Sequence, residues 1–364
     1  MNHRKETSNA RHLALVMVGT VIGAGFASGA EIKVYFVQYG EMGFWSMGLA
    51  GLLFFLGIYG TLKIAHEYGH REYGAFAETI AGKWLGAVLD ALVIFSMLLG
   101  YGVMLAGSDA VFLQQWGLPR PIGSLAMAGG CAAALCSGTK GIMGVNRILT
   151  PLLITGIFLV SIYSIWTSPS VSETMGLNLQ PLSVLTARPL EGIGRAFGSA
   201  ALYASYNMLG AGTVLVALSD CIHTKGEAMA TGVWTVIILI FLTFVLGLAT
   251  FLNYDTIVNI PIPVLELLRE CELGKRMYVF VLLGAMYTTA VSDGFGFMNR
   301  IQAICSVRKG ILWVGMTMAA LMLSRLGFTD LVAKGYRILG YVGSVQLVLI
   351  AIRCIFKKET INGK

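Results

Sequence analysis

Residues 19–29 read GTVIGAGFASG and lie in the middle of an apolar segment that runs from residue 11 to residue 36. Four glycines among these eleven residues weaken any helix that passes through them. Backbone groups left unpaired in hydrocarbon are costly and are tolerated only where they line a cavity or bind a ligand. The stretch therefore predicts a membrane helix that is broken at a binding site.

The composition of the whole chain is that of a membrane protein. It has 364 residues, of which 56% are hydrophobic and 12% charged, whereas an ordinary soluble domain is about 25% charged. Apolar segments long enough to cross the hydrocarbon core of a bilayer recur along the chain. We count ten of them, at residues 11–36, 42–65, 85–113, 121–138, 148–167, 192–219, 228–253, 276–304, 310–327 and 331–352. An all-α polytopic membrane protein is predicted, and a soluble protein is excluded.

The sixth segment carries a second interruption. Residues 198–212 read GSAALYASYNMLGAG, which is polar and glycine-bearing where the neighbouring segments are strongly apolar. The interruptions stand at the same place in two halves of five segments, residues 11–167 and 192–352, and five segments give the second half the opposite orientation. We therefore expect one transmembrane domain, residues 1–364, built as an inverted repeat with helices 1 and 6 interrupted. The alternative is that the glycines only allow close helix packing, through small-xxx-small spacing.

The distribution of charge predicts how the chain lies in the membrane. The formal charge of +7 comes from short clusters between apolar segments, so no nucleic-acid partner is indicated and the lipid bilayer is the expected surroundings. Most Lys and Arg residues fall on one side if both termini are cytoplasmic, which favours that orientation in the inner (plasma) membrane. The connections 168–191 and 254–275 then lie outside, and the second contains a short amphipathic pattern after Pro261 and Pro263 that could cover an external vestibule.

The eighth segment contains a candidate cation site. Ala285, Thr288 and Thr289 stand at positions i, i+3 and i+4, so one helix face presents two hydroxyls and a carbonyl. Such oxygens are the ligands of a hard cation, and carbonyls freed by the break in the first segment could complete its shell. Threonines in membrane helices also commonly bond back to their own helix, which is the alternative interpretation.

With these residues in place, the chain resembles the YkvI-like bacterial membrane proteins, which are grouped as amino-acid permeases of the amino acid–polyamine–organocation superfamily with the LeuT-type fold. The resemblance covers the whole chain and is most specific at GTVIGAGFASGAEI (residues 19–32). It is supported by VMLAGSDAVF (residues 103–112) and LYASYNMLGAG (residues 202–212). It implies a transporter and not an enzyme.

The resemblance also implies a sodium site between the first and eighth helices. In sodium-coupled members of this fold, main-chain oxygens of a G-x-x-V-G-x-G stretch and the oxygens of an A-x-x-T-[ST] stretch hold the ion. The matching positions here are Gly19 and Ile22 on the first segment and Ala285, Thr288 and Thr289 on the eighth. Sodium would then be the coupling ion, and no other cofactor is expected.

Proton coupling is the alternative within the same fold. Proton-coupled relatives carry a lysine on the fifth helix in place of sodium, and this chain has no lysine between Lys140 and Lys225. That absence favours sodium. Asp109 and Asp293 remain as alternative proton carriers, because ionisable groups within membrane spans are usually functional.

By the same resemblance, an organic substrate would lie beside the two breaks. Its carboxylate would rest on the amides around Ala24, Gly25 and Phe26. The sixth segment would supply Tyr203, Ala204, Ser205 and Asn207, and Tyr101 could reach in from the third segment. No acidic residue lies in either interruption, so a small neutral amino acid or similar solute is expected rather than a polyamine.

Two other classes of protein must be weighed against a sodium-coupled symporter that works by alternating access. His66-Glu67-Tyr68-Gly69-His70 matches H-E-x-x-H, the zinc-binding pattern of metalloproteases, but it lies at the polar end of the second segment, and Asp293 is the only candidate for the third ligand that such a site needs. A channel is the other alternative, because broken helices also line pores. Paired, inverted breaks favour one central site with alternating access over a continuous pore.

Overall fold

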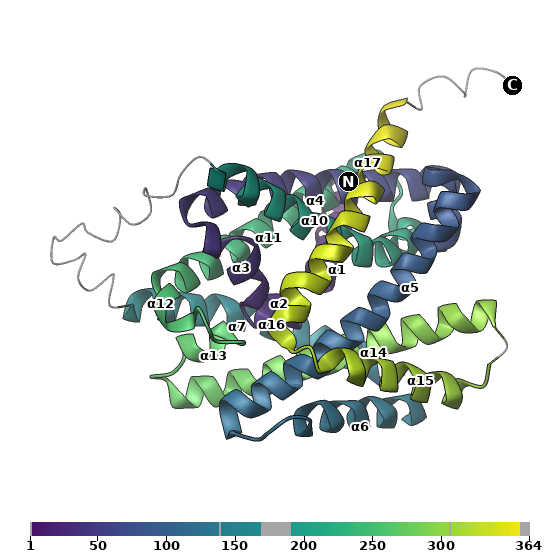
Figure 1. Cartoon of the computed structure of the whole chain (residues 1–364). Coiled ribbons are helices and arrows are strands. Elements are labelled where there is room, and N and C mark those ends of the chain that lie inside the picture. The colour runs from purple at the N-terminus through teal and green to yellow at the C-terminus, as the bar shows by residue number, and fades with distance from the viewer. Residues whose placement is uncertain (1, 138–139, 169–190, 306, 357–364) are drawn as a thin grey trace, which may run out of the picture.

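The computed structural model describes residues 2–137, 140–168, 191–305 and 307–356, and this part of the chain is a bundle of helices without a strand (Figure 1). The long helices are α1 (Asn2–Val21), α4 (Glu41–Tyr68), α5 (Tyr73–Trp116), α6 (Ile122–Ser137), α7 (Lys140–Thr167), α10 (Glu191–Leu218), α11 (Lys225–Leu252), α14 (Glu272–Ile304), α15 (Lys309–Ser324) and α17 (Tyr336–Phe356). The short elements are α2 (Ala24–Ala27), α3 (Ala30–Tyr35), η1 (Val37–Tyr39), η2 (Ser219–Cys221), α12 (Tyr254–Ile257), α13 (Pro263–Leu267), α16 (Phe328–Asp330) and the π-helix η3 (Leu331–Gly335). The predicted all-α class is confirmed. The expected outer connection 168–191 falls almost entirely outside the described residues.

Seven helices of the described part are long and apolar enough to cross a membrane. They span Glu41–Tyr68, Tyr73–Trp116, Leu149–Thr167, Gly192–Cys221, Lys225–Leu252, Glu272–Ile304 and Phe328–Ile355. Two further predicted segments correspond to shorter apolar helices, Ile122–Ala134 and Lys309–Ser324, and the first segment corresponds to the broken series α1–α3. Large apolar side chains stand exposed along α15, namely Ile311, Val314, Met318 and Met322. Such a surface is expected of a helix whose outer face meets lipid.

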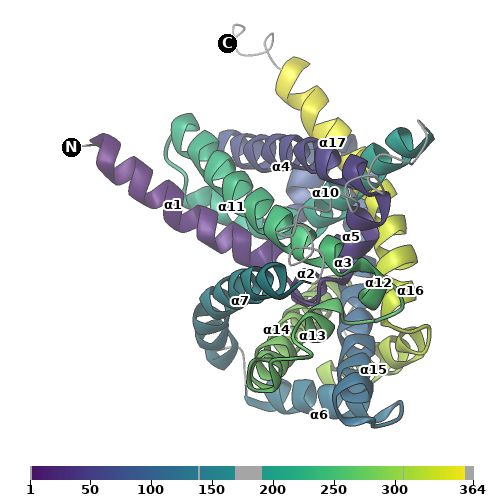
Figure 2. The same cartoon turned by 90° about the vertical axis from the view of Figure 1, so that its left-hand side faces the viewer.

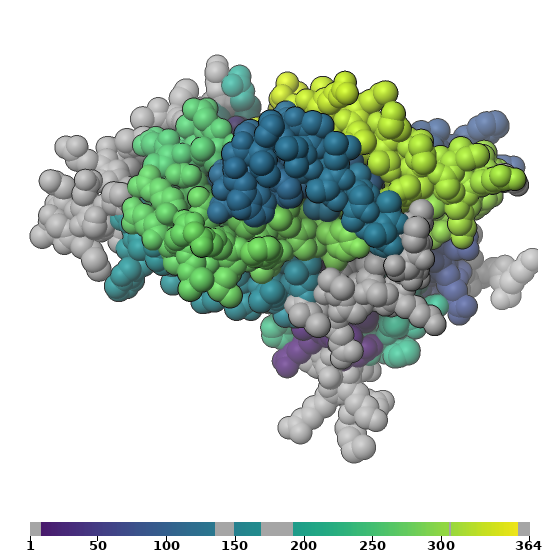
Figure 3. Space-filling view, turned by 90° about the horizontal axis from the view of Figure 1, so that it is seen from below, coloured from purple at the N-terminus to yellow at the C-terminus, as the bar shows by residue number. Residues whose placement is uncertain are grey.

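The helices surround a centre made by α10 and the short helices of the break. α10 packs between α4 and α17, and α14 packs along α5 (Figure 1). α1 runs beside α11, and α7 lies next to both α11 and α14 (Figure 2). Seen from below, α6 crosses the middle of the face in front of α14, with α15 beside it (Figure 3). α2 and α3 therefore lie inside the bundle, where side chains from several helices can reach them.

The first membrane helix is broken, as the glycine-rich stretch predicts. The amide of Gly23 donates to the carbonyl of Val21 at 2.9 Å, so the carbonyl of Gly19 loses the partner that a continuous helix would provide. After four residues of α2 the chain turns again at Gly29, which has a φ of 78° and so adopts the left-handed conformation that favours glycine. α3 then continues on the other side of this second turn.

The predicted interruption of the sixth segment is wrong, because α10 is one continuous helix from Glu191 to Leu218. A glycine inside a helix costs only about 1 kcal/mol, which the packing of a buried helix can outweigh. The close approach to α17 is instead made by glycines of α17: a Cβ on Gly340 would lie 2.8 Å from the carbonyl oxygen of Leu202, and one on Gly343 would collide with that of Ser205. Small residues of α17, which the sequence analysis did not single out, therefore serve packing at this contact.

Candidate functional site

The break sets α2 inside the bundle as a separate piece of buried backbone. Ala24, Gly25 and Phe26, the residues predicted to meet the substrate from the first segment, all lie in it and are buried. The Tyr278 hydroxyl of α14 donates to the carbonyl of Ala27 at 2.7 Å and anchors the end of α2. α2 is therefore a short, buried piece of main chain that a neighbouring helix holds in place.

Glu31 of α3 lies directly against α2, and sequence analysis missed its role. Its carboxylate oxygen Oε1 stands where a Cβ atom on Gly25 would be, so the close contact depends on glycine. Glu31 is only 4% exposed, and its Oε2 atom has no hydrogen-bond partner. Among the described residues, no lysine or arginine forms an ion pair with it. The inference that no group is available to pair with a cation is therefore wrong: residues 19–29 contain no acid, but the chain folds one back onto them.

Four tyrosines gather around this carboxylate. Tyr35 of α3 and Tyr203 and Tyr206 of α10 form a triangle with ring centres 5.5 to 5.7 Å apart, and Tyr336 stacks on Tyr206 at 4.7 Å. All four interact electrostatically with Glu31. The hydroxyl of Tyr35 is buried without a hydrogen-bond partner. We call Glu31 and these four tyrosines the Glu31 cluster.

The residues predicted from the sixth segment point in different directions. Tyr203 enters the Glu31 cluster, whereas the hydroxyl of Ser205 accepts a hydrogen bond from Ser344 of α17 at 3.0 Å. Asn207 donates to the carbonyl of Tyr203 in its own helix at 3.0 Å, and Ala204 is fully buried. Successive residues of a continuous helix diverge by about 100°, so these four side chains do not line one common wall.

Tyr101 lies apart from the residues with which it was grouped. Its ring centre is 5.8 Å from that of Trp313 on α15. In the described part of the chain, no hydrogen bond or ring contact joins it to α2 or α10. This placement in the α5–α15 contact argues against a direct role in substrate binding.

The two halves of the predicted cation site lie on α1 and α14. A Cβ on Gly19 would lie 2.6 Å from Cγ2 of Thr150, so the broken end of α1 faces a neutral, hydroxyl-bearing residue of α7. On α14 the Thr288 hydroxyl donates to the carbonyl of Ala285 at 3.2 Å, the back-bond of the alternative interpretation. Ile22 is buried and Thr289 is half-buried. That these groups meet around one ion stays a prediction.

The two aspartates considered as proton carriers have different surroundings. Asp109 of α5 is buried, and its Oδ1 accepts a hydrogen bond at 2.7 Å from the amide of Ser124 in the first turn of α6. That is a structural role, because it satisfies a free helix amide. Asp293 of α14 instead presses its carboxylate against Gly100 of α5, at the place where a Cβ would lie.

The H-E-x-x-H pattern does not form a metal site in the described structure. α4 ends at Tyr68, and Gly69 turns the chain with a φ of 68°, so His70 leaves the helix that carries His66. His70 makes a 2.7 Å hydrogen bond with Thr79, and partial burial lowers the pKa of its imidazole. Within the described residues, no group of three His, Cys, Asp or Glu side chains could hold a metal ion.

The connection between α11 and α14 covers one side of the break. The amide of Val264 in α13 donates to the carbonyl of Ser28 at 3.1 Å. Lys33 of α3 ties the same connection down, because its ammonium donates to three main-chain carbonyls, those of Ile257, Val258 and Ile260. The short amphipathic segment thus lies over α2 and α3, which agrees with its predicted position as a cover.

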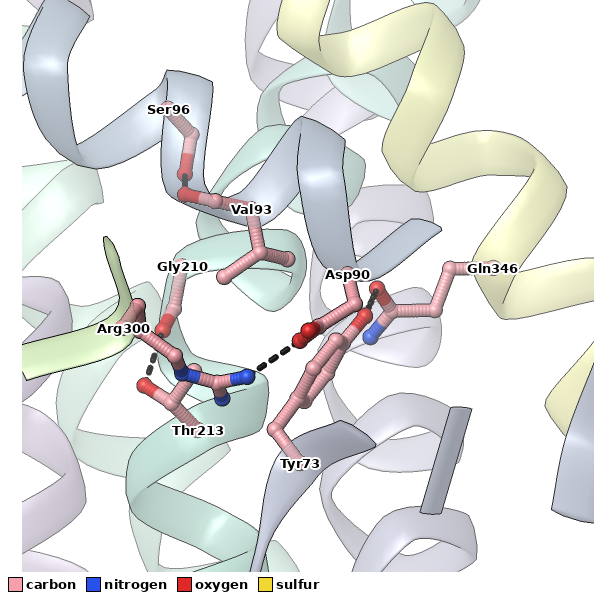
Figure 4. A network of polar contacts seen from close by, with 8 residues as sticks. All are labelled: Tyr73, Asp90, Val93, Ser96, Gly210, Thr213, Arg300 and Gln346. Carbon is pink, nitrogen blue, oxygen red and sulfur yellow. Dashed lines mark hydrogen bonds and ion pairs between the residues drawn. The ribbon is translucent and has the colours of Figure 1, made fainter. Parts of the chain in front are cut away.

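A second polar network lies near the C-terminal end of α14. Arg300 forms an ion pair with Asp90 of α5, and its guanidinium lies 5.6 Å from the ring centre of Tyr73 (Figure 4). The Tyr73 hydroxyl donates to the side chain of Gln346 on α17 at 2.7 Å. This network joins α5, α14 and α17. Polar contacts therefore hold the helices together here as well as at the connection between α11 and α14.

Two bacterial proteins are similar in sequence to this chain over most of its length. The chain is 27% identical over 342 residues to the uncharacterized membrane protein YkvI of Bacillus subtilis (strain 168), covering 92% of this chain and 93% of the relative. It is 26% identical over 355 residues to the uncharacterized protein YyaD of the same organism, covering 94% and 96%. No family model matches. The predicted resemblance to YkvI-like proteins is confirmed.

Solved structures show the same arrangement of helices. MhsT, in complex with L-phenylalanine, superposes with a TM-score of 0.62 at 16% identity, over 94% of this chain and 88% of MhsT. A manganese transporter from Eremococcus coleocola, in complex with an aromatic bis-isothiourea substituted compound, gives 0.53 at 15% identity, over 97% and 78%. The chain therefore shares the LeuT-type fold with these solved structures.

Proposed function

We propose that the protein is a secondary active transporter that carries a small amino acid or related solute together with sodium by alternating access. The observation that carries this proposal is the buried broken helix, α1–α2–α3, in a bundle of LeuT-type fold. Broken helices in membrane proteins place unpaired backbone where a solute or an ion binds. The inner (plasma) membrane with both termini cytoplasmic is the location that the charge pattern favours.

Sodium as the coupling ion rests on the surroundings of the break. The carbonyl of Gly19 is released from helical pairing, and the residue of α7 that a Cβ on Gly19 would meet is the hydroxyl-bearing Thr150 rather than a lysine. Thr288 and Thr289 on α14 supply further hydroxyl oxygens. A cation held between α1 and α14 would fix the broken helix against α14 and thereby complete the substrate site.

The solute is proposed from the character of the site. α2 offers fixed backbone, and Tyr203 adds a buried aromatic wall beside it. MhsT, which shares the fold, is described in complex with L-phenylalanine, so an amino acid is a reasonable first ligand. A small neutral amino acid or a related amine-bearing solute is therefore the class to test first.

Proton coupling is a second candidate, and a specific observation favours it. Glu31 and Asp293 are carboxylates that lie close against other helices, and no ion pair neutralises them in the described part of the chain. A carboxylate in hydrocarbon is costly in its charged form, so a proton is one way to balance it. Proton coupling would use these groups instead of the threonines of α14.

The test is uptake into liposomes that contain the purified protein. We expect an inward sodium gradient to drive uptake of a solute identified by thermal stabilisation, and Thr288→Ala with Thr289→Ala to abolish the sodium dependence. The matched control is Thr231→Ala with Thr235→Ala on α11, because these buried threonines also donate to carbonyls of their own helix, as Thr288 does. Undiminished sodium-driven uptake in the α14 variant would rule out this site, and uptake driven by a pH gradient alone would favour proton coupling.

A further inference from the structure

The Glu31 cluster combines two features that recognise positive charge. One is a carboxylate that is 4% exposed, with an oxygen atom that lacks any partner. The other is a set of four buried tyrosine rings that come from three separate elements of the fold. A buried anion without a partner is expensive, and aromatic faces attract cations.

Within the described residues, no basic side chain forms an ion pair with Glu31. The nearest basic residue on the same helix, Lys33, points away and donates to the carbonyls of the covering connection. Arg337 follows Tyr336 and acts electrostatically on Tyr35, but it forms no ion pair with Glu31. Nothing in the described chain balances a charged Glu31, so the carboxylate either takes up a proton, as in the second candidate function, or binds a cation from outside.

The position of the carboxylate also determines which end of a solute can bind there. Glu31 Oε1 rests on the backbone of Gly25, where the resemblance places the carboxylate of an amino acid. Two carboxylates at that place would repel each other. An ammonium group placed there would instead meet an anion and the faces of the surrounding rings.

The way the chain presents Tyr336 is a further sign of a binding site. It follows the π-helix η3, Leu331–Gly335, and begins α17. Single π turns inside helices occur frequently at functional sites, because the extra residue redirects the side chains that follow. Here the redirected ring stacks on Tyr206 and completes the cluster.

We propose that Glu31 and the four tyrosines bind the ammonium group of the transported solute, which is an organic amine that needs no carboxylate. This inference rests on the proposed transport function and narrows its substrate class. Phe36 and Phe54, whose ring centres lie 5.0 and 5.8 Å from that of Tyr203, provide an apolar wall for the rest of the amine. The substrate class is therefore a monoamine with an apolar body.

The test uses three compounds that share a 2-phenylethyl group and differ in the groups attached to its end: 2-phenylethylamine, L-phenylalanine and 3-phenylpropanoate. Thermal stabilisation of the detergent-purified full chain reports binding, because a ligand that binds only the folded state raises the melting temperature. We expect 2-phenylethylamine to stabilise the protein at least as well as L-phenylalanine, and 3-phenylpropanoate to have no effect.

Two variants then assign the effect to the cluster. Glu31→Gln keeps the shape of the side chain and removes its charge, and we expect it to raise the amine concentration for half-maximal stabilisation roughly 100-fold. The control is Glu270→Gln, an exposed carboxylate that contacts Arg269 at 3.5 Å, and it should bind as the parent protein does. A milder variant, Tyr206→Phe, keeps the ring and should retain most of the binding if Glu31→Gln fails to fold.

The outcomes separate this inference from the proposed function. The inference is overturned if no amine stabilises the protein, if L-phenylalanine binds and 2-phenylethylamine does not, or if Glu31→Gln binds the amine normally. If the amine binds through Glu31 but no ion gradient drives its uptake into liposomes, the binding assignment stands and the transport function fails. If an ion gradient drives uptake of the amine and Glu31→Gln does not change that uptake, the transport function stands and the binding assignment fails.

Discussion

The contact between Gly25 and Glu31 predicts a measurable energetic coupling. A Cβ on Gly25 would take the place of Oε1 and would also lie 2.9 Å from Cδ and 3.3 Å from Cγ of Glu31. In Gly25→Ala the whole end of the Glu31 side chain must therefore move within a site that leaves it only 4% exposed. Overpacking of a buried site of this kind costs about 1–3 kcal/mol. We expect Gly25→Ala to lower the melting temperature of the purified protein accordingly.

A double-mutant cycle isolates the cause of that loss. In the background of Glu31→Ala the obstructing atoms are absent, so Gly25→Ala should cost close to nothing and the coupling energy should equal about 1–3 kcal/mol. Gly23→Ala is the control, because a Cβ at Gly23 meets no atom within 4 Å and its φ of −85° suits alanine. The assay is the melting temperature of all five proteins at one scan rate and in one detergent.

Two results would refute the reasoning. If Gly25→Ala melts like the parent protein, the Glu31 side chain has room to turn aside and the cluster is not tightly packed. If Gly25→Ala is equally destabilising with and without Glu31, the strain lies elsewhere in α2. Either result would also weaken the assignment of the Glu31 cluster as a closed recognition site.

Two further contacts make predictions of their own. Asp90→Asn should destabilise the protein by about 1–3 kcal/mol in the melting assay, since it leaves a partly buried Arg300 without its anion. If Asp90→Asn causes an equal loss of stability in an Arg300→Met background, the two side chains do not form a direct pair. Gly343→Ala should be more damaging, because its Cβ would collide with the backbone carbonyl of Ser205, which cannot turn aside. Gly210→Ala, where a Cβ meets nothing within 4 Å, should melt like the parent protein, and similar melting of both variants would contradict the close α10–α17 contact.

The candidate site was only partly predictable. The broken first helix follows from local chemistry, because four glycines in eleven residues weaken helical pairing wherever they occur. Glu31 was also visible as a charged residue inside an apolar segment, which is a functional signal in membrane proteins. Its contact with Gly25 was not visible, because the second turn at Gly29 that brings the two together depends on tertiary packing.

The sixth segment shows the limit of the same argument. Its glycines resemble those of the first segment, yet α10 stays continuous and α17 presses against it at Gly340 and Gly343. Glycine only lowers the energetic cost of a break. Whether a break forms depends on what the neighbouring helices offer the freed backbone, and that is information about partners distant in sequence.

The sequence by itself determined the membrane class, the helical architecture and the place of the break, because hydrophobicity, segment length and glycine content act locally along the chain. The tertiary structure decided that α10 is unbroken, that Tyr101 lies away from α2, and that Glu31 meets tyrosines from α3, α10 and α17. These features depend on side chains brought together from up to 305 positions apart, from Glu31 to Tyr336, and no local pattern encodes such a meeting.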